Sequence, residues 1–218
     1  MKKLFAFLLV FFLFSAVIFT AEEGFKLPAP QKDIALSKLL EGRESVRQFA
    51  EKNLSLQELS TILWAGQGMK SSSKKRTTPS AGALYPIELF VMTGNISDLK
   101  AGIYHYDTPS HTLKLQVAGD KRKELLEKGA IRQDWVATAP AIVLITYIKS
   151  RTEGKYKERS ISYIAVEGGA VMQNVYLMAQ SLGLGTCAVG AFDDAKVKAV
   201  FNLKEEEPIL LMPVGHIK

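Results

Sequence analysis

The sequence predicts one α+β or mixed α/β domain that follows a short, very apolar N-terminal segment. The chain has 218 residues, a length that favours a single domain with a core of its own. Residues 160–182 are dominated by Ala, Val, Met, Tyr and Leu, and they predict a long buried helix. Residues 141–148 are a continuous apolar run, which is typical of a buried strand. Helical and strand-like segments are thus mixed along one chain.

The N-terminal segment differs in composition from the rest of the chain. Lys2 and Lys3 precede residues 4–21, which carry no charged side chain. A positive start followed by an apolar run predicts either a signal peptide or an uncleaved membrane anchor over residues 1–21. The anchor would associate the protein with the membrane.

Both alternatives place the following domain on the extracytoplasmic side, because the positive end of the segment stays inside. Cleavage after Ala21 would put Phe19 where a small residue is preferred, so neither alternative is excluded. Residues 22–32 contain two prolines and are interpreted as a linker. The domain itself is expected at residues 33–218.

The first part of this domain predicts two helices. A short helix is expected at residues 33–41, ending at Gly42. Ser55 and Glu58 form a capping box ahead of an apolar stripe, which predicts the start of a second helix. Gly66 is its predicted end.

The later elements are expected from apolar runs, helix caps and turn residues. They are a strand at 87–93, a hairpin at 102–119 with its turn at 107–111, a helix at 120–128, a strand at 141–148, a helix at 160–182, a strand at 186–192, a helix at 193–201 and a strand at 208–215. No pattern repeats, so these elements are expected to form one unit.

Several common functional sites are missing from the sequence. The net charge is +6, but no helix carries a dense basic stripe, so nucleic-acid binding is not expected. Cys187 is the single cysteine, which excludes an intrachain disulfide. His105, His111 and His216 lack the spacing of metal ligands, so no metal site is expected. The sequence also lacks a nucleophile elbow and a phosphate loop, which disfavours hydrolases and kinases.

The stretch from Gly183 to Ala188 fits the glycine pattern of dinucleotide-binding loops, but its context does not. Such a loop follows a strand and opens a helix, whereas here a helix ends and a strand begins. Gly183 is therefore interpreted as the left-handed residue that ends the helix. Small residues at Gly190 and Ala191 admit either another strand or a flat ligand close to the backbone.

Two other segments suit an anionic, flat ligand. In GRESVRQF, Arg43, Ser45 and Arg47 alternate, so an extended chain places their side chains on one side, where they suit a phosphate. The alternative is a solvated basic strand. In TPSAGALYP, the small residues from Ser80 to Gly82 leave room for a planar ring, and the alternative is a plain turn.

Four motifs together resemble the nitroreductase family of flavin enzymes. They are RESVRQF, TTPSAGALYPIELFV, EGGAVMQNVYLMAQSLGLGTCAVGAFDD and LLMPVGH, and the resemblance runs from about Glu41 to Gly215. It is closest to the SagB-type branch, which includes azoline-forming dehydrogenases of peptide maturation. The resemblance implies an α+β fold with a central, mainly antiparallel sheet flanked by helices. It also implies a homodimer with FMN bound at the dimer interface.

The resemblance assigns cofactor-binding roles to residues in the first and third motifs. Arg43 and Ser45 would hold the FMN phosphate. Arg47 would lie near the pyrimidine edge of the flavin ring, where a cation favours the reduced form. Gly190 and Ala191 would bring a backbone N–H to flavin N5.

The resemblance also assigns site roles to residues of the second motif and of two segments outside the motifs. Gln133 is expected at the flavin rim. Lys155 and Tyr156 resemble a catalytic Lys-Tyr pair of the azoline-forming branch, and the alternative is an exposed charged loop. The backbone that a partner subunit would lay against the flavin consists of Pro79, Ser80, Ala81, Gly82 and Leu84.

These expectations describe an FMN-dependent oxidoreductase that transfers hydride through flavin N5, with NAD(P)H as donor and a small organic molecule as acceptor. Two alternatives stay open: a SagB-type dehydrogenase of peptide azolines, and a non-catalytic, membrane-tethered protein that binds flavin or a partner. Many relatives carry a C-terminal tail that contacts the phosphate, whereas this chain ends at Lys218. Arg43 is therefore expected to carry more of the phosphate contact.

Overall fold

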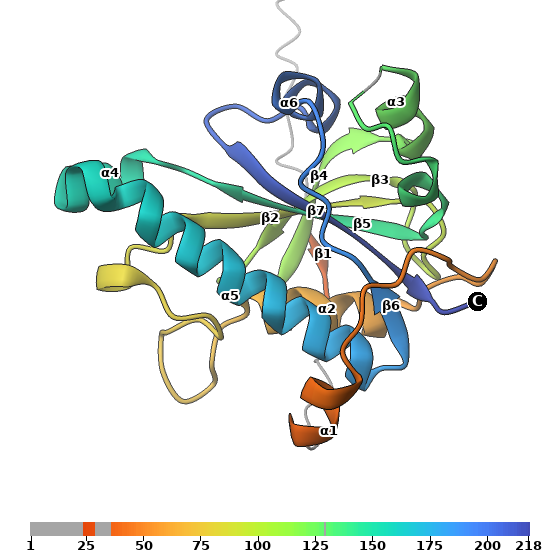
Figure 1. Ribbon diagram of the computed structural model, residues 1–218, viewed down its shortest axis with the longest axis horizontal. Coiled ribbons are helices and arrows are strands. Elements are labelled where there is room, and N and C mark those ends of the chain that lie inside the picture. The colour runs from red at the N-terminus through yellow and green to blue at the C-terminus, as the bar shows by residue number, and fades with distance from the viewer. Residues whose placement is uncertain (1–23, 29–35, 129) are drawn as a thin grey trace, which may run out of the picture.

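One antiparallel sheet forms the centre of the protein (Figure 1). The computed structural model describes residues 24–28, 36–128 and 130–218, and within them seven strands pair in the order β1-β4-β3-β2-β5-β7-β6. Every neighbouring pair is antiparallel. The strands are β1 (Phe25–Lys26), β2 (Ile87–Thr93), β3 (Gly102–Asp107), β4 (Thr112–Ala118), β5 (Ala141–Tyr147), β6 (Leu184–Thr186) and β7 (Glu207–His216). The predicted α+β class and mainly antiparallel sheet are confirmed.

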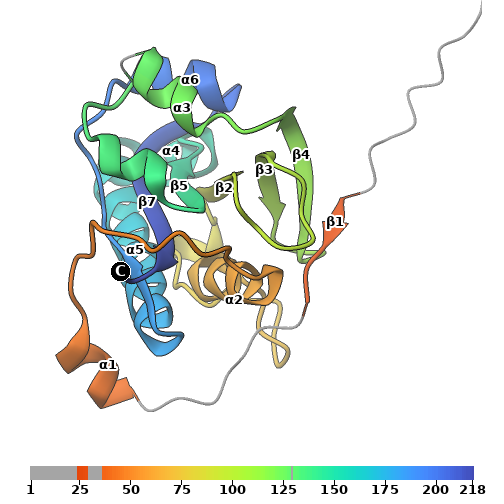
Figure 2. The ribbon, with the colours of Figure 1, turned by 90° about the vertical axis from the view of Figure 1, so that its right-hand side faces the viewer.

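Helices cover both faces of the sheet, with α2 and α5 on one face and α3 and α6 on the other (Figure 2). The α-helices are α1 (Leu36–Gly42), α2 (Leu56–Gln67), α3 (Arg122–Glu127), α4 (Ser150–Tyr156), α5 (Ser160–Ser181) and α6 (Asp194–Phe201), and the short 3-10 helices are η1 (Ala81–Ala83), η2 (Asp134–Thr138) and η3 (Lys157–Arg159). Leu89 and Val91 of β2 pack in the core on the α2 and α5 side. Phe90 and Met92 pack in the core on the other side. Because side chains alternate along a strand, covering both faces requires this continuous apolar run.

The start of α2 follows the prediction, but its end does not. Ser55 Oγ accepts a hydrogen bond from the Glu58 N–H at 3.2 Å, and Glu58 Oε2 accepts one from the Ser55 N–H at 2.7 Å. The predicted stop at Gly66 is wrong, since the helix continues and is capped at Gly68. Gly66 serves packing instead: an added Cβ would lie 3.1 Å from Leu89 Cδ1. The missing side chain lets α2 approach the sheet.

The segment that ends α5 is partly as predicted. Gly183 has φ +68°, so the left-handed stop is confirmed. The strand predicted at residues 186–192 is misplaced, because β6 lies earlier and pairs with the end of β7. Farther along, Val189 pairs with Leu211 in an isolated bridge. Residues 190–191 are thereby left outside the regular sheet.

The N-terminal part of the described chain joins the sheet. Phe25 and Lys26, within the predicted linker, form β1 and pair with β4. The signal peptide or anchor predicted at residues 1–21 lies outside the described residues, as do residues 33–35 of the first predicted helix. Among the residues that are described, no helix combines the length and apolarity needed to cross a bilayer.

Candidate functional site

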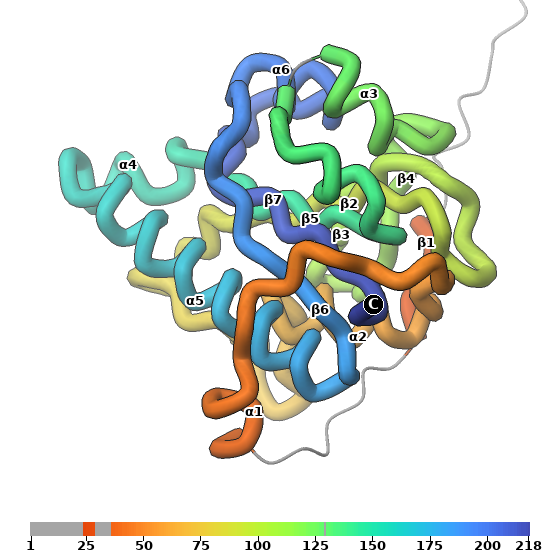
Figure 3. Tube along the Cα trace, turned by 45° about the vertical axis from the view of Figure 1, so that its right-hand side comes forward, coloured from red at the N-terminus to blue at the C-terminus, as the bar shows by residue number. Residues whose placement is uncertain are grey.

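The predicted site residues lie in two groups: the first includes the residues that contact Tyr176 near the end of α5, and the second lies beside the start of α5. The first group lies where the segment after α1 runs beside the segment after β6 (Figure 3). It contains Arg43, Ser45, Arg47, Gln133, Gly190 and Ala191. The second group lies beside α4, at the start of α5 (Figure 1). It contains Pro79, Ser80, Ala81, Gly82, Leu84, Lys155 and Tyr156.

Tyr176 of α5 brings Arg43 and Ser45 together. Ser45 Oγ lies 3.0 Å from the Tyr176 hydroxyl oxygen. The Ala188 N–H donates to the same hydroxyl at 2.7 Å. The guanidinium carbon of Arg43 lies 5.1 Å from the centre of the Tyr176 ring, within the range of a cation–π contact. One buried tyrosine therefore contacts both the cation of Arg43 and the hydroxyl of Ser45.

The segment that carries these residues runs close to β6. Val46 N donates to Thr186 O at 2.9 Å. An added Cβ on Gly185 would lie 2.5 Å from Val46 Cγ1, so a side chain there would push the segment away. Arg47 contacts a different ring, with its guanidinium carbon 6.0 Å from the centre of the Trp135 ring. Arg47 thus links this segment to η2.

Gln133 and Ala191 line one hollow of about 490 Å³, together with Arg132 and Phe192. Gly190 and Ala191 are both exposed. Within the part of the chain that the structure describes, neither of their backbone N–H groups donates to a protein acceptor. A free N–H beside a hollow is suited to a hydrogen bond with a ligand.

The residues of the first group fit FMN. A guanidinium and a hydroxyl suit its phosphate, and free N–H groups with an amide side chain suit the edge of its ring. Ala188, which contacts Tyr176, and Ala191 are close in sequence, so their Cα atoms are at most about 11 Å apart. The arrangement suits an elongated ligand that is anionic at one end and flat at the other.

In the second group, the Lys-Tyr pair contacts the loop around η1. Gly82 has φ +62°, and an added Cβ would lie 2.7 Å from both Lys155 Nζ and Tyr156 Oη. Ser80 Oγ accepts a hydrogen bond from the Tyr85 N–H at 2.8 Å and closes the loop. Gly82 therefore allows an amine and a phenol to reach the backbone that was assigned to the flavin.

Lys155 and Tyr156 lie in the last turn of α4, so the alternative of a charged loop is wrong in its secondary structure. Lys155 is exposed, whereas Tyr156 is half-buried. The Tyr156 ring packs edge-on against the Tyr163 ring, with centroids 4.7 Å apart. Lys155 Nζ lies 5.4 Å from the centre of the Tyr156 ring. Packing thus holds the phenol while the amine faces solvent.

The phosphate end of the first group, beside Tyr176, is far from the second group within one chain. Tyr156 precedes the start of α5 at Ser160, and Tyr176 lies near its other end. At about 1.5 Å per residue, Ser160 and Tyr176 are about 24 Å apart along the helix axis. A ligand held beside Tyr176 is therefore remote from the second group of the same chain.

Tyr176 is a functional candidate that the sequence analysis missed. Its ring is 7% exposed, and its hydroxyl has two protein partners. The hydroxyl of a buried tyrosine generally needs hydrogen-bond partners. A tyrosine in the apolar helix predicted at residues 160–182 could therefore have indicated a polar contact at this position. Among the described residues, no cluster of His, Cys, Asp and Glu could hold a metal ion.

Comparison with known proteins gives the family. The model of the nitroreductase family matches residues 40–216. The chain belongs to the nitroreductase family. A candidate nitroreductase of Methanocaldococcus jannaschii is 39% identical over 184 residues, covering 84% of this chain and 92% of that protein.

More distant relatives are proteins of peptide maturation. The microcin B17-processing protein McbC of Escherichia coli is 28% identical over 178 residues, covering 78% of this chain. The trifolitoxin operon protein TfxC of Rhizobium leguminosarum is 25% identical over 209 residues, covering 87% of this chain. The matches span 65% of McbC and 58% of TfxC.

Solved structures agree with this assignment. The crystal structure of a candidate nitroreductase from Ralstonia eutropha matches with a TM-score of 0.79 and 30% identity, over 91% of each chain. A chain of the Escherichia coli microcin synthetase McbBCD complex matches with a TM-score of 0.69 and 23% identity, over 98% of this chain and 85% of that one. The second likeness concerns the fold alone.

Proposed function

We propose that the protein is an FMN-dependent oxidoreductase that works as a homodimer. The observation that carries the proposal is the division of the candidate site between the two ends of α5. The first group fits FMN, but Tyr176, which supports its phosphate end, lies about 24 Å along α5 from Ser160, beside the second group of the same chain. A second copy, related by a two-fold axis, would bring its second group to the first group of this chain. Membership of the nitroreductase family supports both the cofactor and the dimer.

Helix α5 offers a surface for the second copy. Val166 is 72% exposed and Ile161 is 48% exposed, whereas Val171 and Val175 of the same helix are buried in the core. A two-fold interface pairs the same patch on both chains. Two antiparallel α5 helices would place the start of each beside the end of the other, so that both chains complete each site.

The residues of the first group have distinct roles in this proposal. Arg43 and Ser45 would bind the phosphate, with Tyr176 holding both in place. Arg47 would place a cation near the pyrimidine edge, where it stabilises negative charge on the ring. The Ala191 N–H and the Gln133 amide would orient the ring from the hollow that they share. When bound, FMN would supply the hydride chemistry itself.

We further propose NAD(P)H as electron donor and a small organic molecule as acceptor, on the basis of the family. The test is to mix the FMN-loaded protein with NADH or NADPH without oxygen and to follow the flavin absorbance. Rapid bleaching would support a reductase. A flavin that stays coloured with both donors would contradict it and favour one of the two alternatives, the azoline dehydrogenase or the non-catalytic, flavin-binding or partner-binding protein.

A second candidate function is the oxidation of azolines in peptides. The contact of Lys155 and Tyr156 with Gly82 favours it, because this pair would reach the reaction site of a partner chain as an acid and a base. The likeness to McbC, a microcin-processing protein, gives further support.

The Tyr156→Phe variant distinguishes the two functions. Loss of a general acid or base typically lowers a rate by about 10²–10⁴-fold, so turnover of an azoline peptide should fall in that range. Flavin affinity and bleaching by NADH should be unchanged, because phenylalanine keeps the ring that packs against Tyr163 and neither property needs the hydroxyl. Tyr163→Phe is the matched control, since it removes a hydroxyl from the neighbouring ring. Equal turnover of the azoline peptide by wild type and Tyr156→Phe would exclude a catalytic role.

We also propose that the domain lies outside the cytoplasm. Lys2 and Lys3 followed by the apolar residues 4–21 support this location. Digestion of the protein by protease added to intact spheroplasts is the expected result. Protection until the membrane is lysed would contradict the proposal.

A further inference from the structure

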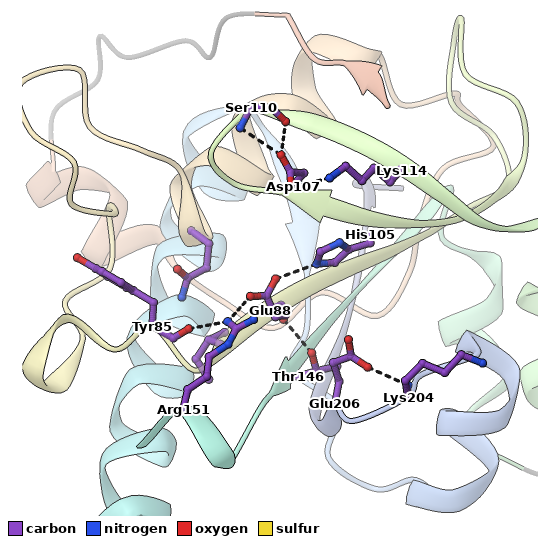
Figure 4. A network of polar contacts seen from close by, with 12 residues as sticks. Tyr85, Glu88, His105, Asp107, Ser110, Lys114, Thr146, Arg151, Lys204 and Glu206 are labelled. Atoms are coloured by element: carbon purple, nitrogen blue, oxygen red, sulfur yellow. Dashed lines mark hydrogen bonds and ion pairs between the residues drawn. The ribbon is translucent and has the colours of Figure 1, made fainter. Parts of the chain in front are cut away.

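Glu88 of β2 is the centre of a buried polar network beside the η1 loop (Figure 4). The residue is 7% exposed. Its Oε2 lies 2.8 Å from His105 Nε2 on β3, and its Oε1 accepts a hydrogen bond from Arg151 at the start of α4. Arg76 Nη2, from the loop after α2, lies 4.0 Å from the same Oε1. Three elements of the chain thus meet at one carboxylate.

The two arginines connect this carboxylate to Tyr85, at the end of the η1 loop. Arg151 Nη1 donates to Tyr85 O at 2.9 Å, as Figure 4 also shows. Arg76 places its guanidinium carbon 4.9 Å from the centre of the Tyr85 ring. Arg76 Nη1 also donates to Ile87 O at 2.9 Å. Glu88 therefore orients the two side chains that hold the loop.

The loop needs such support because its backbone is strained. Gly82, Ala83 and Tyr85 have φ values of +62°, +55° and +47°. Residues other than glycine rarely adopt this left-handed region, and they keep it only where the surroundings impose it. The hydrogen bond from Arg151 to Tyr85 O and the contact of Arg76 with the Tyr85 ring help to impose it.

The same network fixes α4. Arg151 lies in the first turn of α4, and Lys155 lies one turn farther on the same face. Burial alone would raise the pKa of Glu88, but hydrogen bonds from His105 and Arg151 outweigh it and lower the pKa below its usual value. The carboxylate is therefore charged at neutral pH and holds both arginines. One residue thus supports both sides of the contact between Gly82 and the Lys-Tyr pair.

We propose that Glu88 is a positioning residue that sets the place of the η1 loop and of Lys155 and Tyr156 relative to each other. It acts through Arg151 and Arg76 and touches no reacting group itself. Its consequence for turnover rests on the function proposed above, in which this loop and pair complete the site of a partner chain. The positioning itself is a property of the chain and needs no flavin.

Hydrogen exchange of the full-length protein tests the positioning. In Glu88→Gln, backbone amides of residues 80–85 and 150–157 should exchange at least ten-fold faster, while those of β5 keep their wild-type rates. Asp107→Asn is the matched control, because Asp107 lines the same cleft but binds Ser110 and Lys114 of the hairpin. It should leave both segments unchanged. Unchanged exchange in Glu88→Gln, or an equal increase throughout the sheet, would overturn the proposal.

A second variant keeps the test decisive if Glu88→Gln does not fold. The Arg151 side chain is 36% exposed, so Arg151→Ala should fold and accelerate the same two segments. Where Glu88→Gln does fold, the increase in exchange of the double variant should be much smaller than the product of the two single effects, because the two residues share one contact. Fully multiplicative effects would contradict the shared role.

The activity of the FMN-loaded protein gives a second test, which is independent of hydrogen exchange. With FMN at saturation, Glu88→Gln should lower kcat at least ten-fold. If the wild-type protein binds no FMN, the proposed function fails, whereas the exchange measurement still decides the role of Glu88. If FMN binds and exchange is unchanged, the positioning role fails alone.

Discussion

The Val166→Arg variant is expected to be monomeric and to lose most of its FMN affinity while keeping its fold. Val166 is 72% exposed, so the isolated chain loses little packing when it is replaced. In a two-fold interface each substitution occurs twice, and an unpaired buried charge costs about 3–5 kcal/mol. Dimer dissociation should therefore become at least about 150-fold more favourable, and FMN binding should weaken at least about ten-fold. Sedimentation velocity and an FMN titration measure the two effects.

The matched control for this prediction is Ala199→Arg. Ala199 is an exposed residue of α6, on the opposite face of the sheet, and the variant adds the same charge. It should keep the dimer and the FMN affinity of the wild type. A Val166→Arg protein that stays dimeric, or that binds FMN as tightly as Ala199→Arg, would show that α5 is not the interface.

Replacing Arg43 by Ala is expected to weaken FMN binding by about 1.5–3 kcal/mol, the range for a hydrogen bond to a charged group. This corresponds to a dissociation constant about 10- to 150-fold higher. The guanidinium lies over the Tyr176 ring beside the Ser45 hydroxyl, so its removal leaves the phosphate with one neutral donor. Quenching of flavin fluorescence on binding gives the dissociation constant.

Lys38→Ala is the control for Arg43→Ala, because Lys38 is an exposed cation of α1 close to Arg43 in the chain. Its removal lowers the net charge by the same amount. The control should bind FMN like the wild type at physiological salt, where exposed charges more than about 8 Å apart are largely screened. An equal loss of affinity in both variants would point to net charge rather than to a phosphate site. Unchanged affinity in Arg43→Ala would refute its assigned role.

Much of the fold follows from patterns that are local in the sequence. The apolar run of β2 was predictable because both of its faces are covered. The capping box at Ser55 and the left-handed Gly183 were predictable because caps depend on adjacent residues. The end of α2 was not, because Gly66 is needed for contact with Leu89, which is distant in sequence. Such packing leaves no local signal.

From the sequence, candidate site residues could be proposed only where a motif contains them. The order of helix and strand around Gly183 excluded a dinucleotide loop without any structure, and the structure has that order. The support of Arg43 and Ser45 by Tyr176 joins positions more than a hundred residues apart, so no spacing could reveal it. The network of Glu88 is hidden for the same reason, since its partners come from three separate elements. The motifs therefore name candidate residues, but the contacts that position those residues come from distant segments and can be seen only in the structure.

FMN is expected to bind in a site completed by two copies of the chain. Sedimentation velocity of the wild-type protein with added FMN, recorded at the visible flavin band, tests it most directly. Flavin is expected to sediment with a dimer, at one FMN per chain. Protein that sediments without flavin colour, or flavin that sediments with a monomer, would contradict it.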